Sequence, residues 1–256
     1  MSARPGGRSR REAANRLWRV ETPARPVLQK MYGEKGGPFR SVWRAWMSRV
    51  VRGATSSRAE ARCRTERETL ALWREAGIDC PEDLTSRHPA LAGPRVAILE
   101  WIDGLPLPDA LAAAGASRSA RDRLCRIAGA AWGKRHVIAA ERKDARFVQF
   151  HGGFQHLLVV AERVAAIDLE QAYLPGGAVL PRLAREVAAC VRSIAKGADP
   201  AVLRADLVAL AAAHPDTALL RAAVREALRG GGLGRLVDPR RWARRPALRM
   251  LAEVLG

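Results

Sequence analysis

The sequence predicts an α+β fold in which a small sheet-rich N-terminal lobe precedes a larger helical C-terminal lobe. Strand-like segments lead the chain and helical periodicity follows them, and such segregated runs are typical of α+β folds. The 256 residues, 48% of them hydrophobic, suffice to bury a large core. No run of about 18 apolar residues occurs, so we expect no transmembrane helix.

The expected N-terminal lobe combines strands and helices. Residues 17–22 and 25–32 have strand patterns on either side of a Pro-Ala turn. Residues 41–51 form a short amphipathic pattern, and residues 56–77 form a long helical pattern that begins with serine and ends at glycine. Residues 94–104, PRVAILEWIDG, predict a buried strand that ends in a polar turn.

The expected C-terminal lobe is mostly helical and contains one hairpin. The hairpin, LLVV-AE-RVAAID, covers residues 157–168. Apolar residues at helical period on both sides of it predict helices. These helices are expected at 107–115, 117–142, 180–197, 200–214 and 216–228.

Composition and charge divide the chain into two lobes and two terminal tails. Residues 1–12 form a basic tail that we expect to be disordered. The sheet-rich lobe covers residues 13–100, and the helical lobe with its hairpin covers residues 101–228. A basic C-terminal tail, rich in glycine and arginine, covers residues 229–256.

The net charge of +18 indicates the class of partner. Only five of the 44 basic residues are lysines, so arginine dominates. Such a surface attracts phosphate, whether in nucleic acid, anionic lipid or a phosphorylated substrate. A basic surface that is merely solvated is the alternative. The scattered Phe and Tyr residues are not interleaved with basic ones, so we do not expect nucleic-acid binding.

The chain has the features of a cytoplasmic protein. Its start is basic but lacks the apolar run of a secretory signal. Four widely spaced cysteines, Cys63, Cys80, Cys125 and Cys190, have no zinc-type spacing. We expect them to be reduced packing residues.

Lys30 interrupts an apolar strand pattern. Side chains alternate along a strand, so Lys30 shares a face with Leu28 and Tyr32. A lysine held inside a cleft can grip phosphates. The alternative is a lysine on an edge strand whose ammonium reaches water.

Glu66 lies on the apolar face of the helix expected at 56–77. It shares that face with Cys63, Leu70 and Trp73, whereas Glu68 points elsewhere, to solvent. A carboxylate on an apolar stripe is costly to bury unless it is paired. A partner in the site, or a neighbouring arginine, would supply the pairing.

Polar residues stand at both ends of the hairpin. Asp168 follows a buried strand, a position common for metal-binding or catalytic carboxylates and also for turn-capping ones. His151 and His156 precede the hairpin at a spacing that does not suit a zinc site. Each histidine alone is typical of a hydrogen-bonded structural residue.

Taken in order, these residues resemble a protein-kinase-like phosphotransferase of the lipopolysaccharide kinase (Kdo/heptose kinase) type. The segment TERETLALWREAGIDCP is similar to that family's helix and the turn after it. AILEWIDGLPLPDAL is similar to its hinge, and HLLVVAERVAAIDLE to its N-I-L-V…I-D-F-E hairpin. The resemblance spans roughly residues 26–190 and implies a bilobal protein-kinase-like fold.

The resemblance also implies a nucleotide site for ATP and Mg²⁺. Lys30 would bind the α- and β-phosphates and Glu66 would hold it in place. Glu100 and Trp101 would lie at the hinge, where the adenine binds the backbone. Asp168 would take the position of the magnesium-chelating aspartate.

The loop before the hairpin departs from the family pattern. His156 stands where the family has its metal-binding asparagine, and His151 stands five residues earlier, at the place of the catalytic aspartate. Histidine can accept a proton near neutral pH, so His151 could serve as the base. A gapped alignment instead equates His151 with the histidine of the HxD motif and puts Gly153 at the aspartate position, which describes a degenerate kinase.

The sequence therefore predicts an ATP-dependent kinase that phosphorylates a sugar hydroxyl of lipopolysaccharide core or a related glycolipid. Its partner would be an anionic glycolipid or a phosphorylated sugar. We expect at most a peripheral contact with the inner face of the cytoplasmic membrane. The alternative is a pseudokinase that acts as a nucleotide- or partner-binding module.

Overall fold

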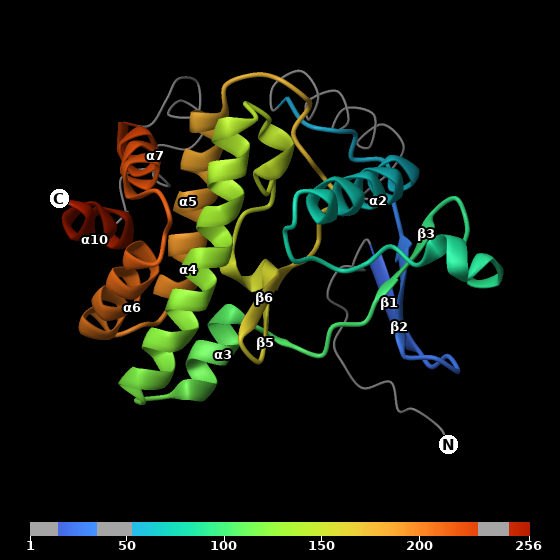
Figure 1. Cartoon of the computed structure of the whole chain (residues 1–256), viewed down its shortest axis with the longest axis horizontal. Coiled ribbons are helices and arrows are strands. Elements are labelled where there is room, and N and C mark those ends of the chain that lie inside the picture. Colours follow the sequence, from blue (N-terminus) through green and yellow to red (C-terminus); the bar gives the residue numbers. More distant parts are fainter. Residues whose placement is uncertain (1–14, 35–52, 230–245) are drawn as a thin grey trace.

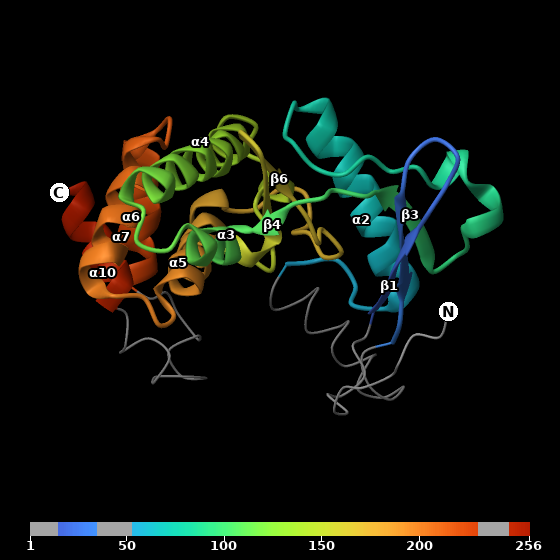
Figure 2. The same cartoon turned by 90° about the horizontal axis from the view of Figure 1, so that it is seen from below.

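The computed structural model describes residues 15–34, 53–229 and 246–256. Within these residues the chain is α+β, as predicted, with two small antiparallel sheets and seven α-helices. The sheet that contains β1–β3 and the helices α4–α7 lie at opposite ends of the molecule (Figures 1 and 2). The tail expected at 1–12 and the helix expected at 41–51 lie outside the described residues.

The first sheet contains β1 (Asn15–Val20), β2 (Val27–Tyr32) and β3 (Val96–Glu100). All neighbours are antiparallel, in the order β1-β2-β3. β2 is therefore the central strand and Lys30 is not on an edge. Lys30 pairs in register with Leu17 on β1 and Ala97 on β3.

Helix α2 (Ala59–Glu75) packs beside this sheet (Figure 1). Its predicted apolar face is confirmed, because Cys63, Leu70 and Trp73 are buried. Gly77 ends the helix with a φ of +70°, a backbone conformation that glycine adopts at little cost. The two short 3₁₀ helices η1 (Thr85–Arg87) and η2 (Pro89–Leu91) lead from there towards β3.

The second sheet stands between the first sheet and the helices. It contains β4 (Leu105–Pro106), β5 (Leu157–Val160) and β6 (Arg163–Ala166), again antiparallel and in that order. The predicted hairpin is confirmed as β5–β6, and Ala161, with a φ of +50°, lies in its turn. β4 was not predicted, because its two residues are too few to show an alternating pattern.

Helices form the rest of the described chain, and all five predicted after residue 105 are confirmed to within a few residues. α4 packs on α6, and α5 packs on α7. A Cβ at Gly129 on α4 would clash with the Leu210 carbonyl oxygen of α6, so glycine permits this close approach. The elements are α3 (Leu107–Ala114), α4 (Arg118–Glu141), η3 (Ala145–Phe147), η4 (Phe154–His156), α5 (Val179–Ala195), α6 (Pro200–Ala212) and α7 (Thr217–Arg229).

The expectation of a basic tail over residues 229–256 is wrong for its last part. Residues Pro246–Leu255 form helix α10, which packs against α5, α6 and α7. Its buried side chains, Ala247, Leu248, Leu251 and Leu255, recur at helical period. The arginine-rich residues just before it dominate the composition of the segment and conceal this short pattern.

One main apolar core joins both ends of the molecule. It includes Tyr32 and Trp73 beside the first sheet and Trp132, Phe154 and Leu207 in the helical part. The two parts are therefore packed together rather than linked by a flexible tether.

The four cysteines are free and buried, which confirms their expected packing role. Burial raises the pKa of the Cys63 thiol to about 11 and that of Cys80 to about 12. It also raises the pKa values of Cys125 and Cys190. The thiols therefore stay protonated and unreactive at neutral pH.

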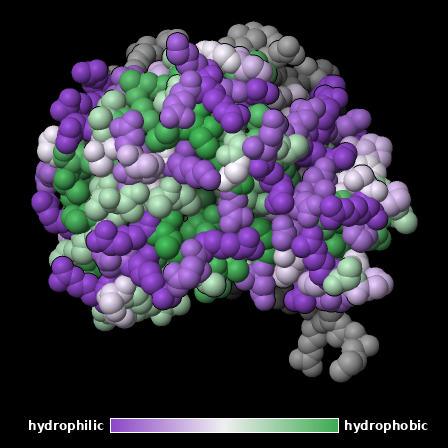
Figure 3. All heavy atoms as spheres, in the orientation of Figure 1, coloured by the Kyte–Doolittle hydropathy of each residue, from purple (hydrophilic) through white to green (hydrophobic). Residues whose placement is uncertain are grey.

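The face seen in Figure 3 is covered mainly by hydrophilic residues, with hydrophobic ones gathered largely over the helical part. None of the helices in the described ranges is both long enough and apolar enough to cross a membrane.

Candidate active site

Lys30 is the centre of a cluster of ion pairs. Its ammonium nitrogen Nζ lies 2.7 Å from Glu66 Oε2 and 2.9 Å from Asp168 Oδ1. Glu170 Oε2 is 3.8 Å away. The structure therefore brings together three residues, Lys30, Glu66 and Asp168, that were singled out from the sequence on three separate elements.

The alternation of β2 explains why Lys30 points inward. Lys30 is 5% exposed and Tyr32, two residues later, is 1% exposed on the same face. The Tyr32 hydroxyl donates a hydrogen bond to Glu66 Oε2. Burial opposes the charged ammonium, but the carboxylates of Glu66, Asp168 and Glu170 outweigh it and raise the pKa of Lys30.

Glu66 is held on several sides. Besides Lys30 and Tyr32, its Oε1 accepts a hydrogen bond of 3.2 Å from the backbone N–H of Leu169. This bond ties helix α2 to the segment that follows the hairpin. Glu68 is exposed, as predicted, and the partner of Glu66 is Lys30 rather than a neighbouring arginine.

Asp168 follows β6 in an unusual backbone conformation. Its φ is +61°, in the left-handed region that is costly for a residue with a Cβ. The preceding Ile167 N–H donates to the His156 carbonyl oxygen at 2.9 Å, which places the two segments side by side. The Asp168 side chain is 31% exposed, unlike the buried Glu66 and Glu170.

The site also includes an acid and an arginine, Glu170 and Arg62, that do not stand out in the sequence. Glu170 is 2% exposed and accepts hydrogen bonds from Arg62 (2.9 Å) and from the Asn15 amide (2.5 Å). Arg62, fully buried, also donates to the Gly33 carbonyl oxygen. Glu170 carries no local signal in the sequence, because it follows Asp168 outside the strand and its burial depends on the tertiary contact with Arg62.

His156 and His151 line one open cleft of about 500 Å³, which Asp168 and Glu170 also line. His156 Nδ1 lies 3.6 Å from Asp168 Oδ2. Burial lowers the pKa of His156, although Asp168 opposes the shift, so the imidazole is neutral at neutral pH. The structure thus joins both predicted histidines to the lysine cluster through Asp168 and the cleft.

Helix α5 contributes basic residues to the cleft. Arg185 and Arg192 of helix α5 line it, with the small Ala189 between them. Seven residues along a helix correspond to about 10 Å, so the two arginines leave the helix about two turns apart on one face. Both are exposed, and neither pairs with a carboxylate of the described residues.

A buried carboxylate supports the loop that carries the histidines. Glu186 Oε2 accepts a 2.7 Å hydrogen bond from the Gln149 backbone N–H, and its Oε1 is 2.5 Å from Arg135. A Cβ at Gly152 would lie 2.8 Å from Glu186 Cγ, so the loop backbone rests directly on this side chain. Burial opposes ionisation of Glu186, but Arg135 outweighs it and the pKa falls to about 2.

Glu100 and Trp101 lie at the end of β3, outside the lysine cluster. The Glu100 carboxylate accepts from the Glu82 backbone N–H at 3.1 Å and lies 3.4 Å from Arg25. The Trp101 ring lies under the Arg19 guanidinium, 5.3 Å from its centroid. Within the described ranges, no contact joins either residue to Lys30 or to the cleft.

The cluster offers ligands for a divalent cation. Carboxylate oxygens of Glu66, Asp168 and Glu170 lie within 4.8 Å of one another, and Mg²⁺ prefers oxygen ligands. Glu66 is engaged by Lys30, Tyr32 and the backbone and is not among the residues that line the cleft. Asp168 and Glu170 line the cleft, although Glu170 also accepts hydrogen bonds from Arg62 and Asn15. These two carboxylates therefore fit a hard cation best, and His156 is the imidazole beside them.

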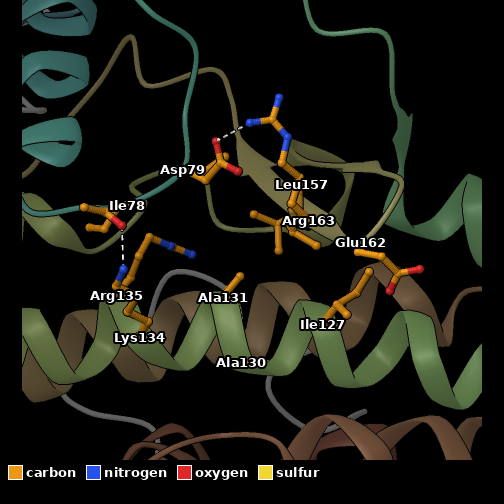
Figure 4. A pocket seen from close by; sticks show the side chains of 13 residues that line it. Ile78, Asp79, Ile127, Ala130, Ala131, Lys134, Arg135, Leu157, Glu162 and Arg163 are labelled. Atoms are coloured by element: carbon orange, nitrogen blue, oxygen red, sulfur yellow. Dashed lines mark hydrogen bonds and ion pairs between the residues drawn. The ribbon is translucent and has the colours of Figure 1, made fainter.

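A second cavity, of about 280 Å³, lies between α4, the loop after α2 and the β5–β6 hairpin (Figure 4). Its floor is apolar, with Ile78, Ile127 and Ala131. Two of its charged side chains are paired within the cavity lining. Lys134 Nζ donates to the Gly77 carbonyl oxygen at 2.5 Å, and Arg163 pairs with Asp79 at 3.6 Å. None of the residues predicted for the site lines it.

A scan of the chain against protein-family models and a search of curated protein sequences both find no match.

Proposed function

We propose that the chain is an ATP-dependent, kinase-like phosphotransferase, with the sheet-bearing part as N-lobe and the helical part as C-lobe. The observation that carries the proposal is the convergence of Lys30, Glu66 and Asp168 within ion-pair distance. A strand lysine, a helix glutamate and an aspartate after a hairpin are the parts that protein kinases use to bind Mg·ATP.

The first sheet suggests how the nucleotide would lie, with its phosphates at Lys30 and its adenine near the end of β3. Lys30 pairs with Ala97 in register, and Glu100 lies three residues further along β3, about 10 Å away. A nucleotide with its phosphates at Lys30 would place its adenine against the backbone near Glu100 and Trp101. Glu66 would orient the ammonium, so that Lys30 binds the α- and β-phosphates.

The cleft residues would carry out the chemistry. Mg²⁺ bound by Asp168 and Glu170 would neutralise charge on the phosphates as the γ-phosphoryl group is transferred. His151 would accept the proton of the attacking hydroxyl. Neutral His156 would lie beside Asp168 as a polar neighbour of the phosphates.

The arginines of α5 support an anionic acceptor. Arg185 and Arg192 line the same cleft as His151 and Asp168. Guanidinium groups bind phosphate and carboxylate oxygens in bidentate fashion. We propose a sugar hydroxyl of lipopolysaccharide core or a related anionic glycolipid as acceptor, which would bring the protein to the inner face of the cytoplasmic membrane.

A catalytically degenerate pseudokinase is the second candidate. The histidines favour it, because His151 and His156 stand where the family has aspartate and asparagine, and imidazole is a weak ligand for Mg²⁺. Such a protein would bind nucleotide or a partner without turnover.

Phosphate transfer distinguishes the two candidates. Purified protein is incubated with Mg·[γ-³²P]ATP and an isolated lipopolysaccharide core oligosaccharide, and the label in the oligosaccharide is counted. A kinase transfers label, and the Asp168→Ala variant does not. Nucleotide binding with no label above the Asp168→Ala background would favour the pseudokinase.

A further inference from the structure

His151 makes one hydrogen bond to a side chain of the described residues. Its Nε2 lies 2.6 Å from Oε1 of Gln171. An amide oxygen only accepts hydrogen bonds, so the ring nitrogen opposite it donates. The proton of the neutral imidazole is then on Nε2, and Nδ1 keeps its lone pair.

Gln171 is well placed to fix this arrangement. It is 8% exposed and is not one of the residues that line the cleft. The next residue is tied down, because Ala172 N–H donates to Thr55 Oγ1 at 3.1 Å and its carbonyl oxygen accepts from Thr55 N–H at 2.8 Å. Phe150 packs edge-on against the His151 ring, with centroids 4.9 Å apart.

We infer that Gln171 is a positioning residue that holds His151 in its Nε2–H tautomer. The catalytic part of this inference rests on the proposed function. The acceptor hydroxyl gives its proton to Nδ1 while its oxygen bonds to the γ-phosphorus. The bond from that phosphorus to the β,γ-bridging oxygen breaks, and ADP leaves with the electron pair.

The tautomer matters because a neutral imidazole has only one accepting nitrogen. With the proton on Nδ1, His151 would present an N–H group where a lone pair is needed. The other charged or titratable groups of the cleft form no hydrogen bond to the His151 ring in the described structure. They are His156, Asp168, Glu170, Arg185 and Arg192. Gln171 is thus the residue that selects the tautomer.

The test reads the tautomer directly. Protein labelled with ¹⁵N-histidine is studied by two-bond ¹H–¹⁵N correlation NMR near pH about 8.5, where an ordinary imidazole is neutral. The chain has five histidines, so a His151→Asn variant identifies the signal. We expect the Nε2–H pattern in the wild type and in Gln171→Glu, which keeps an accepting oxygen. Gln171→Met should give a tautomer mixture, and the matched cleft variant Gln155→Met should not.

An Nδ1–H pattern in the wild type, or an unchanged pattern in Gln171→Met, would overturn the inference. In the transfer assay, Gln171→Met should lower kcat at least about twofold with an unchanged KM for ATP, because only the Nε2–H fraction of the tautomer mixture can accept the proton, and Gln171→Glu should retain activity. An unaltered kcat in Gln171→Met would refute the catalytic role. If the wild type transfers no phosphate, the proposed function fails, while the NMR result still decides the assignment of the tautomer.

Discussion

Lys30 Nζ and Glu66 Oε2 lie 2.7 Å apart, and their side chains are 7% and 2% exposed. One residue comes from β2 and the other from α2, so the pair joins the central strand of the sheet to the helix beside it. Truncating one partner of a buried pair leaves the other charge without compensation. The pair therefore contributes to stability whether or not a nucleotide is bound.

Lys30→Met should lower the free energy of unfolding by about 3–5 kcal/mol, because three carboxylates lose their common cation. Glu66→Gln should cost much less in the Lys30→Met background than in the wild type, with a coupling of at least about 1 kcal/mol. Urea denaturation of the four proteins measures both. The control Glu68→Gln, on the exposed face of the same helix, should change stability by less than about 0.5 kcal/mol. Additive effects of Lys30→Met and Glu66→Gln would contradict the pairing.

The left-handed backbone at Asp168 should lower the stability of the folded chain. Glycine adopts a φ of +61° at little cost and alanine does not. Without nucleotide, Asp168→Gly should therefore be more stable than Asp168→Ala by about 1 kcal/mol. Both variants lose the carboxylate, so the comparison isolates the backbone. Equal denaturation midpoints would show that the residue is unstrained.

Stability should fall in mild acid because of His214, a buried histidine that does not line the cleft. Burial lowers the pKa of His214 to about 4, and the neighbouring His136, whose Nδ1 lies 3.2 Å from His214 Nε2, adds to the shift. The folded pKa lies below the ordinary value of 6.5, so the unfolded chain binds the proton first as pH falls. The contribution of His214 is complete above about pH 6.5 and is lost towards pH 4, a change of about 3 kcal/mol.

Urea denaturation at a series of pH values checks this slope. His214→Gln should flatten the decline between about pH 6.5 and 4, and His88→Gln should not. Glu186, with a pKa of about 2, keeps its charge through most of this window. An unchanged slope in His214→Gln would assign the acid sensitivity to other groups.

Arg185 and Arg192 in the cleft should bind an anionic substrate. In the presence of a saturating non-hydrolysable Mg·ATP analogue, glucose 6-phosphate should bind more tightly than glucose. Arg185→Gln and Arg192→Gln should each weaken that binding on the order of tenfold. Isothermal titration calorimetry at two salt concentrations measures the effect. The control Arg123→Gln, an exposed arginine on α4, should leave it unchanged. Equal affinity for glucose 6-phosphate and glucose would show that the cleft has no anion-binding site.

The parts of the site that could be predicted from sequence are charged residues within apolar patterns. Lys30 interrupts a strand, Glu66 sits on an apolar helix face and Asp168 ends an apolar hairpin, so each one stands out locally. Glu170 could not be selected in this way, because its burial depends on Arg62, which looks like the other arginines of a helix that carries as many glutamates as arginines. Only the tertiary contact between them, 2.9 Å long, reveals the pair.

The predicted fold was incomplete at short elements. Long helices such as α4 carry many periods of an apolar pattern and were located well. α10 has only ten residues beside an arginine-rich segment, and its helical state depends on packing against α5, α6 and α7. Short elements of this kind are specified by tertiary contacts more than by local sequence.

Calorimetric titration of the purified chain with Mg·ATP tests the central claim most directly, because binding does not depend on the identity of the acceptor. We predict saturable 1:1 binding in the wild type, loss of that binding in Asp168→Ala, and unaltered binding in Glu162→Ala, an exposed acid in the turn of the same hairpin. No binding heat in the folded wild type, or the same affinity in Asp168→Ala, would contradict the assignment of Lys30, Glu66 and Asp168 to a nucleotide site.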